Sequence, residues 1–199
     1  MVRVGISVEG RTEVRFVVKV LQPYFLDRNI IIEPVDIRGN VSIDRVTHEL
    51  QKMAFNFDFI TTFYDFYGFK GKSKEETKES LELKIKENTT EKIQSKLIPY
   101  IQMYEFEGIL FSSPDVIAQN LQGENDIFIW AADILKSFGG NPERINDSSQ
   151  TSPSKRLENN TNYQKTTHGP NIASQVGITV IRDNCKGFDE WLEKLEKLI

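Results

Sequence analysis

The stretch that decides the fold is Val2-Arg3-Val4-Gly5-Ile6-Ser7-Val8, which Glu9 and Gly10 follow directly. Its apolar and mostly β-branched residues form a continuous run, which is typical of a strand buried in a sheet. The Glu-Gly pair indicates a tight turn. We therefore expect a strand over residues 2–8 that ends beside an acidic side chain.

An amphipathic helix is expected immediately after this strand. Apolar residues recur there at helical spacing, namely Val14, Val17, Val18 and Leu21. Thr12 has the side chain of an N-cap residue, and Pro23 is expected to kink or end the helix near its last turn.

The alternation of strand and helix then continues. A second strand is expected from Ile30 to Ile37 and a third from Phe57 to Tyr64, with Asp65 at its carboxyl end. Between them, Ser42 is the expected cap of a helix whose apolar residues recur at helical spacing. The order strand, helix, strand, helix, strand is typical of a mainly parallel sheet flanked by helices, so the predicted fold class is α/β.

The second half of the chain has weaker patterns. Residues 97–103 are expected to form another strand, residues 126–138 an amphipathic helix closed by two glycines, and residues 188–199 a docking helix. The stretch after the glycines is polar and rich in Asn, Ser and Thr. We expect one domain over residues 1–199, in which 141–199 form a polar loop and a helical C-terminal extension.

The composition is that of a compact protein without disulfides. Hydrophobic residues make up 39% of the 199 residues, which is enough to build a core. Cys185 is the one cysteine, so no disulfide forms within the chain. The N-terminus lacks the apolar stretch of a signal peptide, and no segment is apolar for the length of a membrane span. We expect a cytoplasmic protein without a membrane partner, and the net charge of −4 counts against one that coats nucleic acid nonspecifically.

Two carboxylates are predicted to meet at one edge of the sheet. Glu9 follows the first strand and Asp65 ends the third, and open parallel sheets bind ligands beyond the carboxyl ends of their strands. Converging carboxylates repel each other, so a hard cation such as Mg²⁺ or Mn²⁺ is the usual reason for them. Such a cation polarises phosphoryl groups and activates water. The alternative is that Glu9 only forms the turn.

Glu105 and Glu107 form a second acidic pair. On a strand, side chains two residues apart lie on the same face, whereas on a helix they diverge. If the segment is helical, only one of the two faces the site. The alternative is that one glutamate caps a helix over residues 109–111.

A basic segment offers phosphate-binding side chains. Lys155 and Arg156 follow Ser152-Pro153-Ser154 and are expected at the start of a short helix. Arginine binds a phosphate through two hydrogen bonds and lysine neutralises it as a point charge. His168 is a candidate acid, base or phosphate donor. The alternatives are a solvated basic turn and a loop histidine without a role.

Three other kinds of site are excluded by their motifs. Gly71-Lys72-Ser73 resembles the end of an ATP-binding P-loop, but Phe66 stands where that motif needs glycine. One cysteine and two histidines, His48 and His168, do not make a zinc site. The G-x-S-x-G turn of serine hydrolases is missing.

The residues above also carry a resemblance to a known family. Its motifs, in chain order, are Val8-Glu9-Gly10-Arg11-Thr12-Glu13, Thr61 to Phe69, Pro99 to Gln102 with Glu105-Phe106-Glu107, Ile145-Asn146-Asp147, Ser152 to Leu157, Gly169-Pro170 with Ile172-Ala173, and Phe188 to Leu192. The pattern resembles the bacterial domain-of-unknown-function family 4276. It is similar to the Toprim domains of topoisomerases, primases and overcoming-lysogenization-defect nucleases, and it spans nearly the whole chain.

The resemblance implies a Toprim-like α/β fold with a metal-dependent phosphoryl-transfer site. The Toprim glutamate, a general acid or base, corresponds to Glu9, and the first aspartate of the Mg²⁺-binding Asp-x-Asp pair corresponds to Asp65. Tyr67 stands where the second aspartate belongs. We therefore expect Glu105 or Glu107 to supply the missing carboxylate, with Glu9, Asp65 and Glu105 as the metal ligands.

Two functions follow as hypotheses. The first is a Toprim-type nuclease that cleaves phosphodiesters in nucleic acid, with the acidic residues named above as catalytic groups and the basic ones as phosphate ligands. The second is a non-catalytic subunit that binds nucleic acid or an ATPase, which Tyr67 favours. A hydrolase of small nucleotides is a third option. Genes of such proteins often lie beside ATPase genes, which implies an ATPase partner and a role in phage defence.

Overall fold

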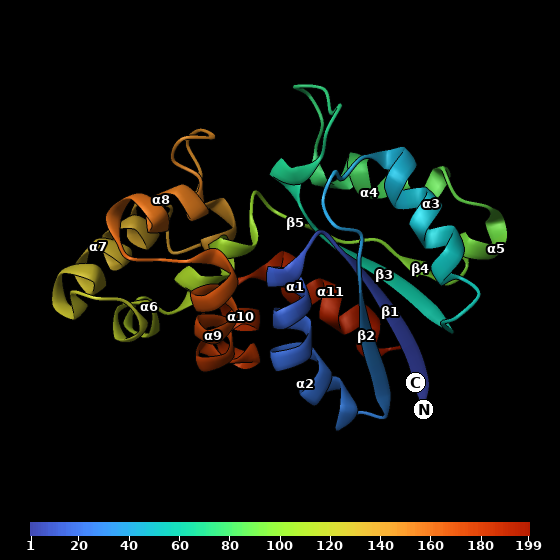
Figure 1. Ribbon diagram of the computed structural model, residues 1–199, viewed down its shortest axis with the longest axis horizontal. Coiled ribbons are helices and arrows are strands. Elements are labelled where there is room, and N and C mark those ends of the chain that lie inside the picture. Colours follow the sequence, from blue (N-terminus) through green and yellow to red (C-terminus); the bar gives the residue numbers. More distant parts are fainter.

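The computed structural model describes all of residues 1–199 apart from the side chain of Glu124. The protein is α/β, with a parallel sheet in the order β2-β1-β3-β4 and the short β5 paired to the end of β3 (Figure 1). The strands are β1 (Val2–Val8), β2 (Ile30–Asp36), β3 (Phe59–Asp65), β4 (Leu97–Ile98) and β5 (Ile101–Gln102).

Helices flank the sheet on both faces, and a group of further helices lies beside α1 (Figure 1). One face is covered by α3 (Ile43–Met53), α4 (Lys78–Glu87) and α5 (Glu91–Gln94). The other is covered by α1 (Arg11–Phe16), α2 (Gln22–Leu26) and α11 (Lys186–Glu196). The group beside α1 consists of α6 (Pro114–Asn120), α7 (Glu124–Ser137), α8 (Pro153–Asn160), α9 (Lys165–Val176) and α10 (Ile178–Asn184). Over the described part of the chain, no helix combines the length and apolar character that a membrane crossing requires.

Alternation along the central strands divides their side chains between two cores. On β1, Val4, Ile6 and Val8 belong to the larger core, which also contains residues of α1, α2 and α11. On β3, Ile60 and Tyr64 belong to the smaller core, together with residues of α3 and α4. Successive strand residues point to opposite faces of the sheet, and each face is buried in one of the two cores. The expected strand–helix–strand order is confirmed, and the acidic residues that follow these strands lie at the carboxyl edge of the sheet.

Residues 11–26 are helical throughout, and the N-cap differs from the expectation. Gly10 is the N-cap, not Thr12, and its N–H is satisfied by the Glu13 carboxylate at 3.0 Å. Pro23 follows a π-helical turn over Val17–Leu21, in the first turn of α2, and lies near the end of the helix, which stops at Leu26. A proline costs little in a first turn, where its missing N–H removes no helical hydrogen bond.

Two segments of the second half also differ from expectation. The predicted strand over residues 97–103 is two short strands, because β4 and β5 pair with different parts of β3. The polar stretch after residue 141 is not one loop. It contains a 3₁₀ turn (Pro142–Arg144) and α8, and Ile145 and Leu157 are fully buried in the larger core.

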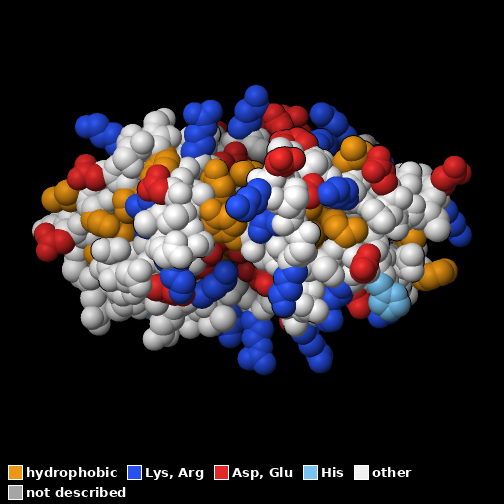
Figure 2. Space-filling model, turned by 90° about the horizontal axis from the view of Figure 1, so that it is seen from above, with side chains coloured by type: hydrophobic (Ala, Val, Ile, Leu, Met, Phe, Trp, Pro, Cys, Tyr) orange, Lys and Arg blue, Asp and Glu red, His pale blue; other side chains and the backbone are white. Residues whose placement is uncertain are grey.

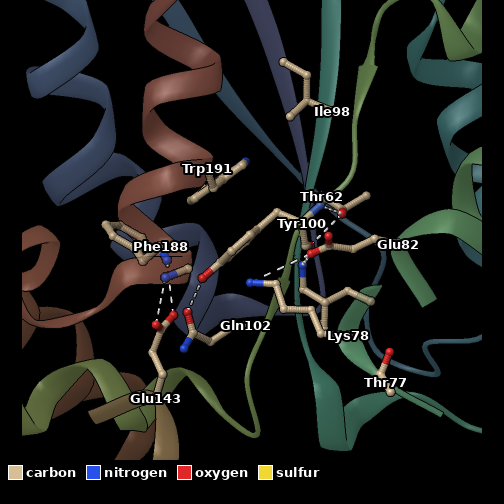
Figure 3. A network of polar contacts seen from close by, with 12 residues as sticks. Thr62, Thr77, Lys78, Glu82, Ile98, Tyr100, Gln102, Glu143, Phe188 and Trp191 are labelled. Carbon is tan, nitrogen blue, oxygen red and sulfur yellow. Dashed lines mark hydrogen bonds and ion pairs between the residues drawn. The ribbon is translucent and has the colours of Figure 1, made fainter. Parts of the chain in front are cut away.

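The expected docking helix is confirmed as α11. Trp191 stacks on Tyr100, with ring centroids 4.5 Å apart (Figure 3). Its Nε1 donates a hydrogen bond to Thr61 Oγ1 at 2.8 Å. At the start of the helix, Glu143 accepts the backbone N–H groups of Gly187 and Phe188. These contacts tie the C-terminal helix directly to β3, and residues of α8 to α11 contribute to the larger core.

Candidate functional site

A polar cavity of about 940 Å³ lies at the carboxyl ends of β1, β2 and β3. Figure 2 looks down on this edge and shows acidic and basic side chains intermixed at its centre. The cavity is lined by Glu9, Gly10, Arg11, Thr12, Glu13, Asp36, Arg38, Gly39, Asp65, Tyr67, Gly68, Glu105 and Lys165. The acidic cluster, as the term is used below, consists of Glu9, Glu13, Asp65, Glu105 and Glu107.

Asp65 is held at the end of β3 with its two oxygens in different surroundings. Oδ1 accepts the backbone N–H of Phe106 at 2.7 Å, and Oδ2 lies 3.6 Å from the ammonium of Lys165. Burial raises the pKa of this carboxyl well above its usual range, and neighbouring carboxylates raise it further, while Lys165 opposes the shift. The expected position of Asp65 at the carboxyl end of the third strand is confirmed, and the residue lines the cavity.

Glu9 meets the turn that follows Asp65. A methyl group at residue 68 would lie 2.5 Å from Glu9 Oε2, so Gly68 leaves the room in which this carboxylate sits. Burial raises the pKa of Glu9, and the charges of Lys165 and Lys70 lower it in part. Glu9 and Asp65, 56 positions apart in the sequence, therefore line one cavity.

Glu107 and Glu105 approach the cavity from the segment after β5. Glu107 lies in a 3₁₀ helix (Phe106–Ser112) and is fully buried, with Oε1 accepting the hydroxyl of Tyr163 at 3.2 Å. Oε2 has no hydrogen-bond donor among the described residues and lies 3.4 Å from the Lys165 ammonium. Burial raises the Glu107 pKa.

Glu105 lies just before that 3₁₀ helix in extended backbone, with φ −147°. It does not cap this helix with its side chain. Instead, Oε2 accepts the backbone N–H of Ser154 at 2.8 Å, in the first turn of α8. Glu105 therefore lines the cavity and also caps α8, whereas Glu107 is fully buried. As expected for a helical segment, only one of the two glutamates faces the cavity, but neither caps a helix over residues 109–111 with its side chain.

Glu13 also belongs to the cluster, although no pattern in the sequence assigned it a role. It lies in the first turn of α1, where Oε2 accepts the Gly10 N–H, and only 4% of its surface is exposed. Burial, together with the charges of Glu107 and Glu9, raises its pKa to about 7 against the pull of Lys165. The signal was present in the sequence, because a glutamate three residues after a turn glycine is typical of a helix start.

Lys165 is the second residue that the sequence did not single out. It is the first residue of α9 and brings its ammonium between Asp65 and Glu107. Burial lowers the Lys165 pKa, but the surrounding carboxylates, led by these two, raise it more, so its pKa lies well above the ordinary lysine value. The cluster is thus partly neutralised by a cation of the protein itself.

The three basic residues expected to bind phosphate do not line this cavity. Lys155 is exposed and pairs with Glu158 at 2.6 Å, whereas Arg156 donates to Asp147 and to the Thr151 carbonyl. His168 accepts a backbone N–H in the first turn of α9 through Nδ1. The positively charged residues that do line the cavity are different ones, and the expected helix over these residues did not indicate which of its side chains face the cavity.

Those cations are Arg11 and Arg38. Arg11 opens α1, and Arg38 follows β2 in the left-handed region, at φ +60°, with its backbone N–H bonded to Asp36 Oδ1. Among the described residues, neither guanidinium makes a hydrogen bond or an ion pair, although both line a cavity rich in carboxylates. Two unpaired positive groups are therefore available to an anionic ligand.

The donor chemistry of the cluster fits a hard divalent cation. All its candidate ligands are carboxylate oxygens, and the buried Oε2 of Glu107 lacks a hydrogen-bond donor. No three acidic, histidine or cysteine side chains among the described residues are already arranged around one point as ligands. The Lys165 ammonium lies between two of these carboxylates, so a bound cation requires Lys165 to move.

Comparison with known proteins identifies a family. The family model described as Domain of unknown function (DUF4276) matches residues 8–196, so the chain belongs to that family. No curated protein and no solved structure matches the chain.

Proposed function

We propose that this family member is a Toprim-like enzyme that hydrolyses phosphodiester bonds, with nucleic acid as its substrate and Mg²⁺ or Mn²⁺ as its cofactor. The observation that carries this proposal is that Glu9, Glu13, Asp65, Glu105 and Lys165 line one cavity at the carboxyl edge of the sheet, with Glu107 buried against Lys165. Four carboxylates of the cluster have raised pKa values, and perturbed carboxylates gathered at a cavity are frequent at functional sites.

The Toprim likeness has support in the order of the acidic residues. A glutamate directly after the first strand and an aspartate at the end of the third, on adjacent parallel strands, are what a Toprim-like site requires. With Tyr67 in place of the second aspartate, Glu107 and Glu105 are the residues close enough to supply the missing carboxylate.

Asp65, Glu107 and Glu9 would hold the divalent cation, with Glu105 completing the set. When bound there, it would act as a Lewis acid on the phosphoryl group and lower the pKa of a coordinated water. Lys165, released from Asp65 and Glu107, would neutralise the phosphoryl oxygens. The Glu9 oxygen that does not contact the cation would take a proton from the attacking water, and the raised pKa of Glu9 favours that uptake.

Cleavage assays test this proposal directly. The purified protein is incubated with plasmid and with single-stranded oligonucleotides in Mg²⁺ or Mn²⁺, beside Glu9→Gln and Asp65→Asn. We expect each substitution to reduce the rate by roughly 100-fold or more, the size of a lost general base or metal ligand. Asp183→Asn is the control, because Asp183 is exposed on α10 and makes no side-chain contact among the described residues. Equal rates in all four proteins would remove the assignment.

One observation favours a second candidate, a non-catalytic subunit that binds nucleic acid or an ATPase. Lys165 already neutralises two buried acidic residues, Asp65 and Glu107, as an internal ion pair does in a site that has lost its metal. Titration calorimetry distinguishes the two, because this candidate predicts no heat of Mn²⁺ binding at millimolar ion and no cleavage.

A further inference from the structure

Three aromatic side chains lie beside the acidic cluster and have no part in the proposed chemistry. Phe66 and Tyr67 follow Asp65 directly, and Tyr104 comes from the segment after β5. The Tyr67 ring lies 5.5 Å from that of Tyr104 and 6.3 Å from that of Phe66. All three are partly exposed, and Tyr67 lines the cavity. These three residues are called the aromatic platform below.

The backbone under the platform is held in an unfavourable conformation. Tyr104 has φ +57°, in the left-handed region that bulky side chains rarely adopt. Its carbonyl accepts the backbone N–H of Tyr67 at 3.0 Å, which fixes the two rings relative to each other. Strain of this kind persists where the surrounding structure enforces it, and it is frequent at ligand sites. A glycine would adopt this conformation without cost, yet the chain has an aromatic residue there.

Positive charge flanks the platform and continues across the cavity. The Lys72 ammonium lies 5.3 Å from the Phe66 ring centroid and 5.7 Å from that of Tyr67. On the β2 side, Arg11 and Arg38 line the same cavity without a side-chain partner among the described residues. A polynucleotide carries one phosphate per nucleotide, so it can contact Lys72, Arg11 and Arg38 at the same time. A ligand with a single phosphate cannot contact cations that lie on both sides of the acidic cluster.

A polar group beside the platform has no partner. Burial raises the pKa of Tyr67, and the nearby Asn146 side chain lowers it in part. The Oδ1 atom of Asn146 is buried and has no hydrogen-bond donor among the described residues. A polar atom without a partner therefore lies close to the platform.

We propose that the aromatic platform stacks an unpaired base, and that the substrate class is therefore single-stranded polynucleotide, DNA or RNA. In a duplex both faces of each base are covered by its neighbours, so a protein aromatic ring reaches a base face only in a single strand or at an unpaired position. The strand then crosses the carboxyl edge of the sheet, with phosphates near Arg11 and Arg38, the reacting phosphate at the acidic cluster, and the next base on Tyr67. This assignment rests on the proposed function for the position of the reacting phosphate.

Fluorescence anisotropy in EDTA measures binding without cleavage. Labelled 12-nucleotide single strands of DNA and of RNA, and a DNA duplex of the same sequence, are titrated with the wild-type protein and its variants. We expect both single strands to bind more tightly than the duplex, and Tyr67→Leu to weaken single-strand binding by roughly 5- to 150-fold, the usual effect of removing one stacking partner. Tyr67→Phe keeps the ring and should restore most of the affinity.

Two further variants separate stacking from folding. Tyr104→Gly removes the second ring and relieves the positive φ, so we expect it to melt no lower than the wild type while it binds single strands more weakly. Phe55→Leu is the matched control, because Phe55 is 87% exposed and lies outside the cavity. A set of oligonucleotides carries one abasic nucleotide, each at a different position. The wild type should bind one of them more weakly than the others, and Tyr67→Leu should bind all of them equally.

The outcomes separate this inference from the proposed function. Platform-dependent single-strand binding without any cleavage in Mg²⁺ or Mn²⁺ supports the inference and contradicts the nuclease. Cleavage that requires Asp65 but is unchanged in Tyr67→Leu, with duplex bound as tightly as single strands, supports the nuclease and overturns the inference. Absence of binding to every oligonucleotide also overturns the inference.

Discussion

Glu13→Gln should stabilise the protein at alkaline pH, because it removes a charge from the crowded acidic cluster. Glu13 is 4% exposed, and its Oε2 accepts the Gly10 N–H at the start of α1. Glutamine retains an acceptor oxygen of the same reach and stays neutral at every pH. The variant therefore keeps the helix cap and loses only the cost of a buried negative charge.

The size of the effect follows from the shift in pKa. The Glu13 pKa rises from 4.5 to about 7 on folding. Below pH 4.5 the carboxyl is protonated in both the folded and the unfolded chain, and its contribution to stability is fully present. As the pH rises to 7, the unfolded chain ionises first and the folded state loses that stability. At roughly 1.4 kcal/mol for each pH unit, the loss is about 3 kcal/mol at pH 8.

Urea unfolding followed by tryptophan fluorescence checks this in EDTA at pH 4.5 and pH 8. The free energy of unfolding of Glu13→Gln should match the wild type at pH 4.5 and exceed it by about 3 kcal/mol at pH 8. Glu87→Gln, at the exposed end of α4, is the control and should change the free energy by less than about 0.5 kcal/mol at either pH. The reasoning fails if Glu13→Gln is no more stable at pH 8, or gains equally at both.

Three further substitutions probe the packing around the site. Lys165→Met should destabilise the protein by about 2 kcal/mol at pH 8, because it leaves Asp65 and Glu107 without their cation. The loss is smaller than that of a fully buried cation, since the Lys165 side chain is 37% exposed, and it should shrink as the pH falls and the carboxylates take up protons. Gly169→Ala would place Cβ 2.7 Å from Tyr163 Oη and should cost about 1–3 kcal/mol. Trp191→Phe removes the hydrogen bond to Thr61 and part of a buried ring, and should cost about 1–3 kcal/mol.

Each of these substitutions has a matched control in the chain. Lys197→Met, Ser174→Ala and Trp130→Phe change residues of the same type, or the same helix, at more exposed positions. Urea unfolding of each pair measures the difference. A Lys165→Met loss that does not depend on pH, or a Gly169→Ala loss no larger than that of Ser174→Ala, contradicts the contacts described for the cavity. A Trp191→Phe variant as stable as Trp130→Phe contradicts the docking of α11.

The first half of the fold could be predicted because its pattern is local and strong. A buried β-branched run, a capping serine at residue 42 and a strand ending at Asp65 each depend on neighbours in the sequence, and all three are found in the structure. Where the parallel order of the strands is known, the meeting of Glu9 and Asp65 follows from topology. The expected cap at Thr12 was wrong, because Gly10 is the N-cap and the Glu13 side chain accepts its backbone N–H.

The rest of the site could not be predicted, because its key contacts are long-range. Lys165 is 100 positions from Asp65, and nothing in its surroundings distinguishes it from Lys155, which faces solvent. A helical pattern indicates which residues share a face but not which element that face meets. Glu13 could have been found, since its spacing after Gly10 is typical of a helix start.

The central claim is that the acidic cluster binds a divalent cation in exchange for Lys165. A crystal structure of the protein soaked in Mn²⁺, with the anomalous signal of the ion located, tests it most directly. We expect one strong peak in direct contact with Asp65 and with Glu9 or Glu107, and a Lys165 ammonium displaced from both of its present partners. No peak at the carboxyl edge of the sheet, with Lys165 still between Asp65 and Glu107 at saturating Mn²⁺, would contradict it.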